Sequence, residues 1–367
     1  MKIGMNLLSI IPGHHAGIYA HSRNLLHELT KIEHEHEIIL FTNKEGYENL
    51  KVPEEYGQVK LPISGHSREQ RLLAEQIFLP MYAAREGIDV LHSVDYLAPI
   101  MAPFSTTATI HDMNYQRVPE GFSWLKQTAM KTLVPLSATS ADTVFTVSEF
   151  SKREILDLID IESEKVQVVP NALPDTLIET SPTFPSELTS VRNSKYLLYV
   201  GTTHPHKNTT ALIEAVAQID PVPPLVVCGP KRSDADAVER LAVEKGVSDQ
   251  VYLPGYVEDT ELAGLYEGAA AYVQPSLYEG FGMPLLEAMY FETPVVASDV
   301  AAIPEVAGGA AVYFDPYDST DIADKISRVM DDEELREELV DQGRQRLNKY
   351  SWEDSAHKLI HHLEQLR

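Results

Sequence analysis

Short apolar runs alternate with amphipathic stretches along almost the whole chain, and this alternation restricts the fold more than any other feature of the sequence. In the first half, the apolar runs predict strands at 2–8, 37–42, 89–94, 107–110, 143–147 and 166–169. The amphipathic stretches between them predict helices at 18–31, 68–85, 124–140 and 149–159. Apolar strands that alternate with helices are typical of parallel sheets wrapped in helices. The sequence therefore predicts an α/β fold.

The alternation stops at a polar stretch and then begins again. From Ser181 to about Asn193 the chain is polar, contains proline and lacks clean periodicity, as expected of an interdomain linker. After it, strands are predicted at 196–201, 225–228, 251–253, 270–273, 294–297 and 311–314. Helices are predicted at 209–218, 236–245, 260–268, 283–290 and 321–330, with a terminal helix capped by Ser351.

This pattern predicts two doubly wound domains. We expect an N-terminal domain at 1–182, a linker at 183–193 and a C-terminal domain at 194–350, with the helix 351–367 packing back on the first domain. The length of 367 residues suits two domains. Ligands of doubly wound sheets bind outside the carboxyl ends of the strands, so we expect the binding site in the cleft between the domains.

Composition excludes some classes of protein. The chain has 30 Lys and Arg against 55 Asp and Glu, a net charge of −25, which argues against a broad nucleic-acid-binding surface. The single cysteine, Cys228, cannot form an intrachain disulfide, favours a reducing compartment and is expected to be a buried thiol. No apolar stretch reaches the ~20 residues of a membrane span, and the N-terminus does not resemble a signal peptide. We therefore expect a cytoplasmic protein that can still contact the inner face of a membrane.

The segment 272–287 carries the strongest signal for a binding site. A loop with Glu279, Gly280 and Gly282 follows a strand, and Pro284 suits the first turn of the next helix. The glycines let the backbone approach a ligand, and the free N–H groups and dipole of the helix start favour an anion. Glu279 and, one turn into the helix, Glu287 could bind sugar hydroxyls on either side of that anion. The alternative is a glycine-rich turn with a surface glutamate.

Glu279 and Glu287, with Gly-Phe-Gly-Met-Pro between them, resemble the signature of glycosyltransferase family 4, whose members are retaining enzymes. Further segments match the family in its own order. Segment 199–208 resembles the strand and loop that bring a lysine to the donor diphosphate, 226–230 the next strand and turn, 251–257 the segment near the base, and 295–306 the stretch after the signature. In the first half, the landmarks are 109–113, 147–152 and 169–172.

The resemblance covers nearly the whole chain. Segment 68–80 and the His-Asp pair at 111–112 are similar to the bacterial mannosyltransferase branch of the family. The resemblance implies the GT-B fold, in which two Rossmann-like domains with doubly wound parallel sheets face a central cleft.

The resemblance also implies a role for each matching residue. Glu287 is expected to hold the ribose hydroxyls, Glu279 the donor hexose near its 3-hydroxyl, and Lys207 the diphosphate leaving group. His111, with Asp112 beside it, is expected at the donor sugar. The implied catalytic residues are therefore His111, Lys207 and Glu279. The implied donor-binding residues are Gly17, Thr202, His206, Lys207, Lys231, Tyr256, Val257, Glu279, Gly280, Phe281, Gly282, Met283 and Glu287.

The expected chemistry requires no metal and no cofactor. Negative charge develops on the leaving phosphate, and a lysine with a helix N-terminus can stabilise it. By resemblance to the family, we expect retention through front-face attack, in which the leaving phosphate helps to take the acceptor proton. GDP-mannose is the expected donor, with a UDP-sugar as the alternative, and the acceptor is a saccharide or lipid-linked saccharide. Asp234 and Asp236 match the Asp-x-Asp metal motif of the other glycosyltransferase fold, but they precede a helix, where aspartate is a natural N-cap.

Two positions depart from the family pattern. Where much of the family has an arginine five residues before the lysine, this chain has Thr202, and His206 directly precedes the lysine. The second cation at the diphosphate is thus open among His206, Lys231 and Arg232. The first-domain loop 13–17, which should approach the phosphate and the acceptor, is less glycine-rich than usual, and its His14 and His15 either face the acceptor or are solvated.

Other readings remain open. Lys207 could be a surface residue, His111 a satisfied histidine at a strand end, and Arg71 an exposed helix charge. An epimerase or a phosphorylase of the same fold, or a binding protein without activity, are the alternative functions. A phosphorylase would need a pyridoxal phosphate lysine in its own context, which we do not find. The first strand is not followed by Gly-x-Gly-x-x-Gly, which argues against a nicotinamide dehydrogenase.

Overall fold

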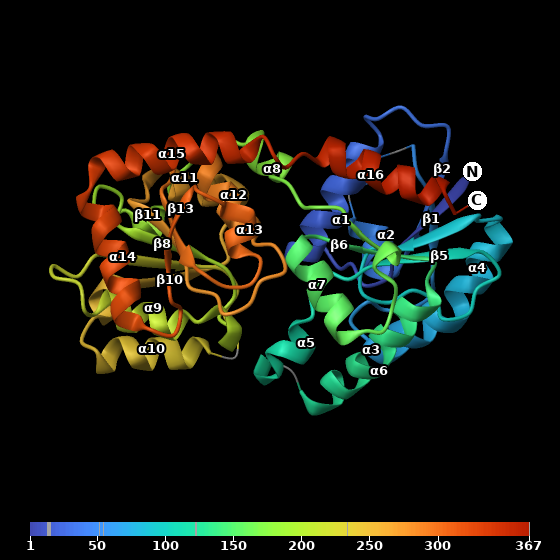
Figure 1. Ribbon diagram of the computed structural model, residues 1–367, viewed down its shortest axis with the longest axis horizontal. Coiled ribbons are helices and arrows are strands. Elements are labelled where there is room, and N and C mark those ends of the chain that lie inside the picture. Colours follow the sequence, from blue (N-terminus) through green and yellow to red (C-terminus); the bar gives the residue numbers. More distant parts are fainter. Residues whose placement is uncertain (13–15, 51, 54, 122, 233, 367) are drawn as a thin grey trace. The chain divides into compact units, whose positions relative to one another are not determined.

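The computed structural model describes residues 1–12, 16–50, 52–53, 55–121, 123–232 and 234–366 (Figure 1). The chain forms two compact units. The first unit contains residues 1–116, 124–171 and 351–367, and the second contains residues 117–123 and 172–350. Among the helices of these residues, none has both the length and the apolar character needed to cross a membrane.

The first unit is built on a parallel sheet of seven strands. The strands are β1 (Lys2–Leu7), β2 (Glu37–Thr42), β3 (Gly57–Lys60), β4 (Val90–Ser93), β5 (Ser105–Thr109), β6 (Thr143–Thr146) and β7 (Val166–Val168). Their order is β3-β2-β1-β4-β5-β6-β7, and every neighbouring pair is parallel. The central strands are buried along nearly their whole length, which is why they appear in the sequence as continuous apolar runs. The edge strand β3 is largely exposed and has no such run, so the sequence did not predict it.

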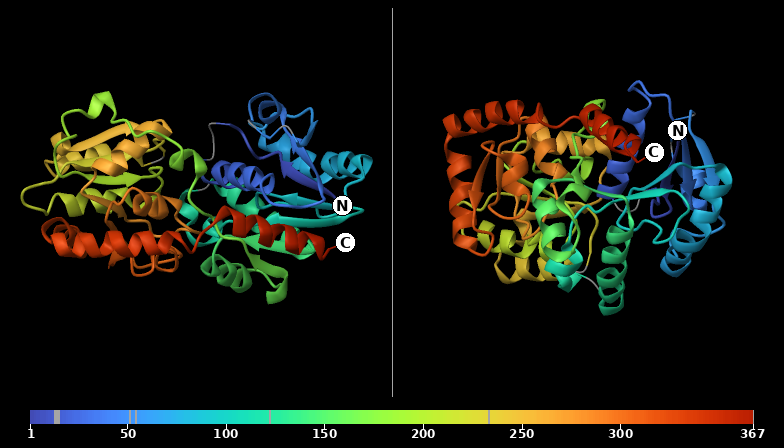
Figure 2. Two further views of the ribbon diagram at one scale, coloured as in Figure 1. Left: turned by 90° about the horizontal axis from the view of Figure 1, so that it is seen from above. Right: turned by 45° about the vertical axis from the view of Figure 1, so that its right-hand side comes forward.

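The helices of the first half surround this sheet. They are α1 (Ala16–Leu29), α2 (Lys44–Asn49), α3 (Arg68–Leu73), α4 (Leu79–Glu86), α5 (Asn114–Arg117), α6 (Trp124–Ser140) and α7 (Glu149–Leu158). The predicted helix 68–85 consists of α3, a π-helical segment η1 (Ala74–Phe78) and α4. The C-terminal helix α16 (Trp352–Glu364) packs against α1, as Figure 2 also shows. The hydroxyl of Ser355 in α16 donates to the carbonyl oxygen of Pro170 at 2.8 Å, so the end of the chain belongs to the first unit.

The second unit contains a parallel sheet of six strands. These are β8 (Leu197–Val200), β9 (Leu225–Cys228), β10 (Val251–Gly255), β11 (Ala271–Gln274), β12 (Val295–Ser298) and β13 (Ala311–Phe314). The helices are α8 (Asp175–Ile178), α9 (Thr209–Val216), α10 (Ala235–Glu244), α11 (Asp259–Gly268), α12 (Met283–Tyr290), α13 (Ile303–Ala307), α14 (Ser319–Asp331) and α15 (Glu333–Leu347). The strand order β10-β9-β8-β11-β12-β13 is doubly wound, and its direction reverses between β8 and β11. Ligands of such sheets bind at this reversal.

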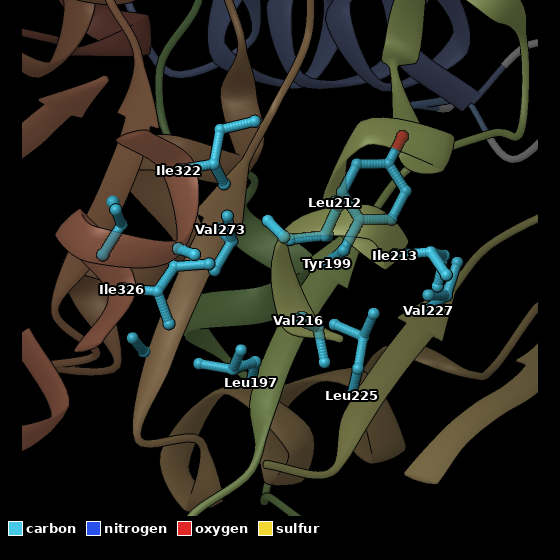
Figure 3. Close-up of a cluster of buried hydrophobic side chains, with 14 of the residues drawn as sticks. Leu197, Tyr199, Leu212, Ile213, Val216, Leu225, Val227, Val273, Ile322 and Ile326 are labelled. Atoms are coloured by element: carbon cyan, nitrogen blue, oxygen red, sulfur yellow. The ribbon is translucent and has the colours of Figure 1, made fainter. Parts of the chain in front are cut away.

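One face of this sheet packs on α9, α10 and α14. Figure 3 shows the side chains that α9 and α14 contribute to this core. Alternate residues of the strands enter this core, among them Leu197 and Tyr199 of β8 and Val273 of β11. The hydroxyl of Tyr199 lies at the end of the core and donates to the carbonyl oxygen of Thr202 at 2.9 Å. The loop that follows β8 is therefore tied to a buried aromatic side chain.

The segment 183–193, which the sequence predicts as a linker, lies within the second unit. The N–H of Thr183 donates to the carbonyl oxygen of Thr260 at 2.9 Å, and Leu188 and Val191 are buried. The chain passes between the units at residues 171 and 172 instead. Two buried apolar residues in a polar stretch form no helical or strand period, so the sequence predicted a linker where the chain in fact packs on the second unit.

Candidate functional site

The loops that follow β8 and β11 meet at the reversal point of the second sheet. Strands β8 and β11 are paired, and each places its following loop at the same edge. Lys207 ends the short 3₁₀ helix η5 (Pro205–Lys207) after β8, and Glu279 lies in the loop after β11. Lys207 Nζ lies 2.7 Å from Glu279 Oε1, and the two side chains are 21% and 12% exposed. The two predicted catalytic residues of this unit therefore form a mostly buried ion pair.

Two further donors hold the carboxylate of Glu279 in one orientation. Gln274 Nε2 and Ser276 Oγ donate to Oε1 at 2.8 and 2.7 Å. Burial acts to raise the pKa of Glu279, but the charge and hydrogen bond of Lys207 and the hydrogen bond of Ser276 outweigh it and hold the pKa below its usual range. Within the described part of the chain, Oε2 accepts no hydrogen bond, so an ionised oxygen is available to a ligand.

Asn208 fixes the loop that carries Lys207. Its backbone is left-handed, with φ 55°, and its Nδ2 donates to the carbonyl oxygens of Pro275 and Pro316 at 3.1 and 2.8 Å. The N–H of Leu277 donates to the carbonyl oxygen of His206 at 2.8 Å. Asn208 occupies the N-cap position of α9, but its side chain makes no capping bond. It joins the loops after β8, β11 and β13 instead.

Helix α12 begins directly beside this pair. Gly282 is its N-cap with φ 94°, and Pro284 lies in the first turn. In the part of the chain that the structure describes, the backbone N–H groups of Phe281, Gly282 and Met283 donate to no protein acceptor. The first N–H groups of a helix have no partner inside it and attract anions. The start of α12 thus offers unpaired N–H donors four residues after Glu279, as an anion-binding site requires.

Glu287 lies in the second turn of α12 and is 8% exposed. Its Oε2 accepts a hydrogen bond of 2.9 Å from the hydroxyl of Tyr266. Burial raises the pKa of Glu287 to about 7, although the bond from Tyr266 acts in the opposite direction. Burial and the charge of Glu287 raise the pKa of the Cys228 thiol to about 12, so this thiol is a buried, unreactive group.

The ends of β8, β9 and β10 approach one another closely. A Cβ on Gly229, whose φ is 133°, would lie 2.2 Å from the carbonyl oxygen of Gly201. The N–H of Gly229 donates to the carbonyl oxygen of Gly255 at 2.7 Å. Beyond β10, Tyr256 is exposed and Val257 is buried. Of the two residues predicted near the base, only Tyr256 has an exposed side chain, whereas Val257 belongs to the core.

The three candidates for a second cation differ in their surroundings. Burial and the charge of Lys207 lower the pKa of His206 to about 4, so His206 is neutral at pH 7. Lys231 forms an exposed ion pair of 2.7 Å with Glu239. The side chain of Arg232 is exposed, and its backbone N–H donates to Thr203 Oγ1 at 2.7 Å. His206 therefore supplies a hydrogen-bonding ring here, not a positive charge.

Thr202 and the aspartates of the Asp-x-Asp match have other positions. The Thr202 carbonyl oxygen accepts the Tyr199 hydroxyl described above. Asp234 occupies the N-cap position of α10 without a capping side-chain bond, and Asp236 lies in the first turn. The N–H of Asp234 donates to the carbonyl oxygen of Thr203 at 3.0 Å.

In the first unit, His111 follows β5. The Nε2–H of His111 donates to the carbonyl oxygen of Val94 at 2.9 Å, because a carbonyl can only accept. The neighbouring Asp112 accepts from the hydroxyl of Tyr96 at 2.7 Å and from the N–H of Asn114 at 3.1 Å. Both side chains of the His-Asp pair are therefore oriented by fixed partners.

His21 is a buried neighbour of His111 that sequence reasoning did not identify. Its ring packs edge-on against the ring of His111, with centroids 4.9 Å apart. Its Nδ1–H donates to Asn171 Oδ1 at 2.7 Å, and burial and His111 lower its pKa to about 3. The one sequence signal was Asn171 in the landmark at 169–172. Gly17, predicted in a loop, lies in the first turn of α1, and residues 13–15 are outside the described residues.

Comparison with known proteins identifies the family of the chain. Residues 16–176 match the family model described as Glycosyltransferase Family 4, and residues 181–346 match the model described as Glycosyl transferases group 1. The chain is 32% identical to the O-antigen chain mannosyltransferase B of Escherichia coli over 80% of each chain.

Solved structures share the fold. The sucrose-phosphate synthase of Thermosynechococcus elongatus superposes with a TM-score of 0.82 at 23% identity, over 100% of this chain and 99% of the other. HepE of Anabaena, solved in complex with UDP, superposes with a TM-score of 0.75 at 17% identity, over 100% of both chains.

Proposed function

Because the chain belongs to glycosyltransferase family 4, in the branch of the bacterial mannosyltransferases, we propose that it transfers mannose from GDP-mannose to a saccharide or lipid-linked saccharide with retention of configuration. The two doubly wound sheets and the likeness to solved structures agree with the predicted GT-B fold. UDP in the HepE structure makes a UDP-sugar the second donor to test.

The observation that supports this proposal best is the Lys207–Glu279 ion pair beside the start of α12. A nucleoside diphosphate carries anionic oxygens, and the N–H groups of Phe281, Gly282 and Met283 match them. Lys207 can turn from Glu279 to the diphosphate and neutralise it. The free Oε2 of Glu279 then accepts a hydrogen bond from a hydroxyl of the hexose, and Glu287 with its Tyr266 partner matches ribose hydroxyls.

The proposed chemistry follows from these groups. The bond between the anomeric carbon and the phosphate oxygen breaks, and a bond from the acceptor oxygen to the same face of that carbon forms. The acceptor proton passes to the leaving phosphate. Lys207 and the α12 N–H groups stabilise the charge that develops on this phosphate, and preorganised donors of this kind contribute more in the transition state than water does. We propose that no metal is required.

His111 remains a proposed catalytic residue of the first unit. Its Nε2–H is held by the carbonyl oxygen of Val94, so the neutral ring keeps Nδ1 as an acceptor. An acceptor in this position suits a hydroxyl of the donor sugar. The single buried thiol favours a reducing compartment, and we propose the cytoplasm as the place of the reaction.

A donor screen with product analysis tests the proposal. The protein is incubated with GDP-mannose, UDP-glucose, UDP-N-acetylglucosamine and ADP-glucose, with and without p-nitrophenyl α-mannoside, and released nucleotide is measured. We expect GDP release from GDP-mannose, unchanged by a chelator, and an α-linked product by NMR. A β-linked product excludes retention. An epimerised free sugar without transfer identifies an epimerase, and no turnover with any donor identifies a binding protein.

A further inference from the structure

Glu75 is a buried carboxyl group that the proposed donor site does not use. It lies in the π-helical segment η1 between α3 and α4 and is 4% exposed. π-helical turns are rare and occur frequently at functional sites. Arg71 Nε lies 3.8 Å from Glu75 Oε1, too far for a hydrogen bond. Burial raises the pKa of Glu75 to about 8; the charge of Arg71 acts in the opposite direction, and the charge of Asp95 raises the pKa further.

Three neighbouring polar atoms in this place lack partners. Within the residues that the structure describes, Arg71 Nε, Glu75 Oε2 and Asp95 Oδ1 are buried and make no hydrogen bond. Each buried donor or acceptor without a partner lowers the stability of a folded protein by about 1–3 kcal/mol. Buried groups of this kind are satisfied by water or by a ligand, and a cluster of three ionisable side chains favours a polar ligand.

The cluster lies where the first sheet is expected to bind ligands. Asp95 follows the carboxyl end of β4, which is the edge used by doubly wound sheets. The preceding residue, Val94, accepts the hydrogen bond of His111. Beside the cluster, Arg68 Nη2 donates to the carbonyl oxygen of Lys126 at 3.4 Å. Asp95 is thus the chain neighbour of the residue that binds the proposed catalytic histidine, and both belong to the first unit.

The unpaired atoms also restrict the chemistry of the ligand. Arg71 Nε is a donor, Asp95 Oδ1 is an acceptor, and Glu75 adds a carboxyl group that can do either. Each hydroxyl group both donates and accepts, so neighbouring hydroxyls of a sugar satisfy all three atoms. A phosphate would offer acceptors to Arg71 and to the neighbouring Arg68 and Lys126, but it offers no donor to the oxygen of Asp95.

We infer that Arg71, Glu75 and Asp95 form the subsite that binds neighbouring hydroxyls of a neutral acceptor saccharide. This inference rests on the proposed transferase function and assigns its acceptor class. The acceptor sugar is held in the first unit by one guanidinium and two carboxyl groups, on the side of β4 next to His111.

Saturation-transfer NMR with methyl α-mannoside, methyl α-glucoside, methyl α-galactoside and methyl N-acetylglucosaminide tests the subsite without turnover. At least one glycoside should bind the wild type, and Asp95→Asn, Glu75→Gln and Arg71→Lys should weaken that binding about ten- to hundredfold. These near-isosteric changes favour a folded protein, which calorimetric unfolding checks. Arg85→Ala is the matched control, because Arg85 is exposed on α4 of the same helical stretch. It should bind the glycoside like the wild type.

Further measurements distinguish failure of the acceptor subsite from failure of the donor proposal. GDP affinity, measured by titration calorimetry, should stay within twofold of the wild type in all three variants, because GDP is proposed to bind the second unit. Wild-type binding that persists in the three variants overturns the subsite. Displacement of the glycoside by inorganic phosphate, or binding of phosphate alone, overturns the saccharide class. If GDP does not bind the wild type but the glycoside does, the donor proposal fails and the subsite stands.

Discussion

Replacement of Lys207 by methionine would remove the counter-charge of a carboxylate that is 12% exposed. Glu279 would keep the hydrogen bonds from Gln274 and Ser276. Removal of one partner of a buried ion pair costs about 3–5 kcal/mol. Because the pair keeps some exposure and two donors remain, we expect the lower end, about 3 kcal/mol. A domain of 150–250 residues loses about 2–4 °C for each kcal/mol, so the unfolding of the second unit should shift down by about 6–12 °C.

The sign of the pH dependence follows from the lowered pKa of Glu279. A carboxyl group with a lowered folded-state pKa contributes stability above its unfolded-state pKa, near 4.5, and this contribution is lost as the pH falls through the folded-state value. The difference in the free energy of unfolding between the wild type and Lys207→Met should therefore be largest at pH 7. It should decrease progressively below about pH 4.5.

Differential scanning calorimetry of the wild type, Lys207→Met, Glu279→Gln and the double variant measures this coupling. The double variant should recover about 2 kcal/mol of the summed losses, because it leaves no unpaired charge. Lys245→Met is the control, since Lys245 pairs with Glu214 in the same unit but both are exposed, and it should cost less than about 1 kcal/mol. Equal transitions for wild type and Lys207→Met at pH 7, or a loss that is as large at pH 4, would refute the electrostatic reasoning.

Three further changes probe the same unit. The pKa of Glu287 is raised to about 7, so ionisation of Glu287 lowers the stability of the fold as the pH rises from about 4.5 through 7. By calorimetry, Glu287→Gln should be more stable than the wild type by about 2–3 kcal/mol at pH 8 and equal to it at pH 4. Equal stability at pH 8 would contradict a buried carboxylate. Gly282→Ala, at φ 94°, should cost about 1–2 kcal/mol and weaken GDP binding by calorimetry, whereas unchanged affinity would show that the start of α12 does not approach the ligand. Asn208→Ala should cost about 1–3 kcal/mol in thermal unfolding and raise the KM for GDP-mannose, and a wild-type KM would count against its role in fixing the Lys207 loop.

The sequence predicted the buried part of the fold and missed the exposed part. Central strands such as β6 and β12 are buried on both faces, so their apolar runs were visible without tertiary information. The short exposed strand β3 and the six-residue helix α2 have no apolar period. The π-helical segment η1 lies within a predicted helix and shares its apolar pattern, so the sequence did not distinguish it.

The sequence likewise predicted some residues of the candidate site and missed features that depend on tertiary structure. The motif predicted Lys207 and Glu279, which the fold brings together over 72 positions of sequence. Their direct ion pair could not be predicted, because it depends on which loops meet at the reversal point of the sheet. His21 and Glu75 escaped notice because one buried polar residue inside a helix has no signature in a single sequence.

The rate of GDP release from GDP-mannose, compared between wild type and Lys207→Met under identical conditions, tests the central claim most directly. A cation that stabilises the leaving phosphate should be worth about 10²–10³ in kcat, as for other preorganised electrostatic groups. The account predicts that the wild type turns over GDP-mannose and that the variant is at least about a hundredfold slower. A variant that releases GDP at the wild-type rate would contradict it.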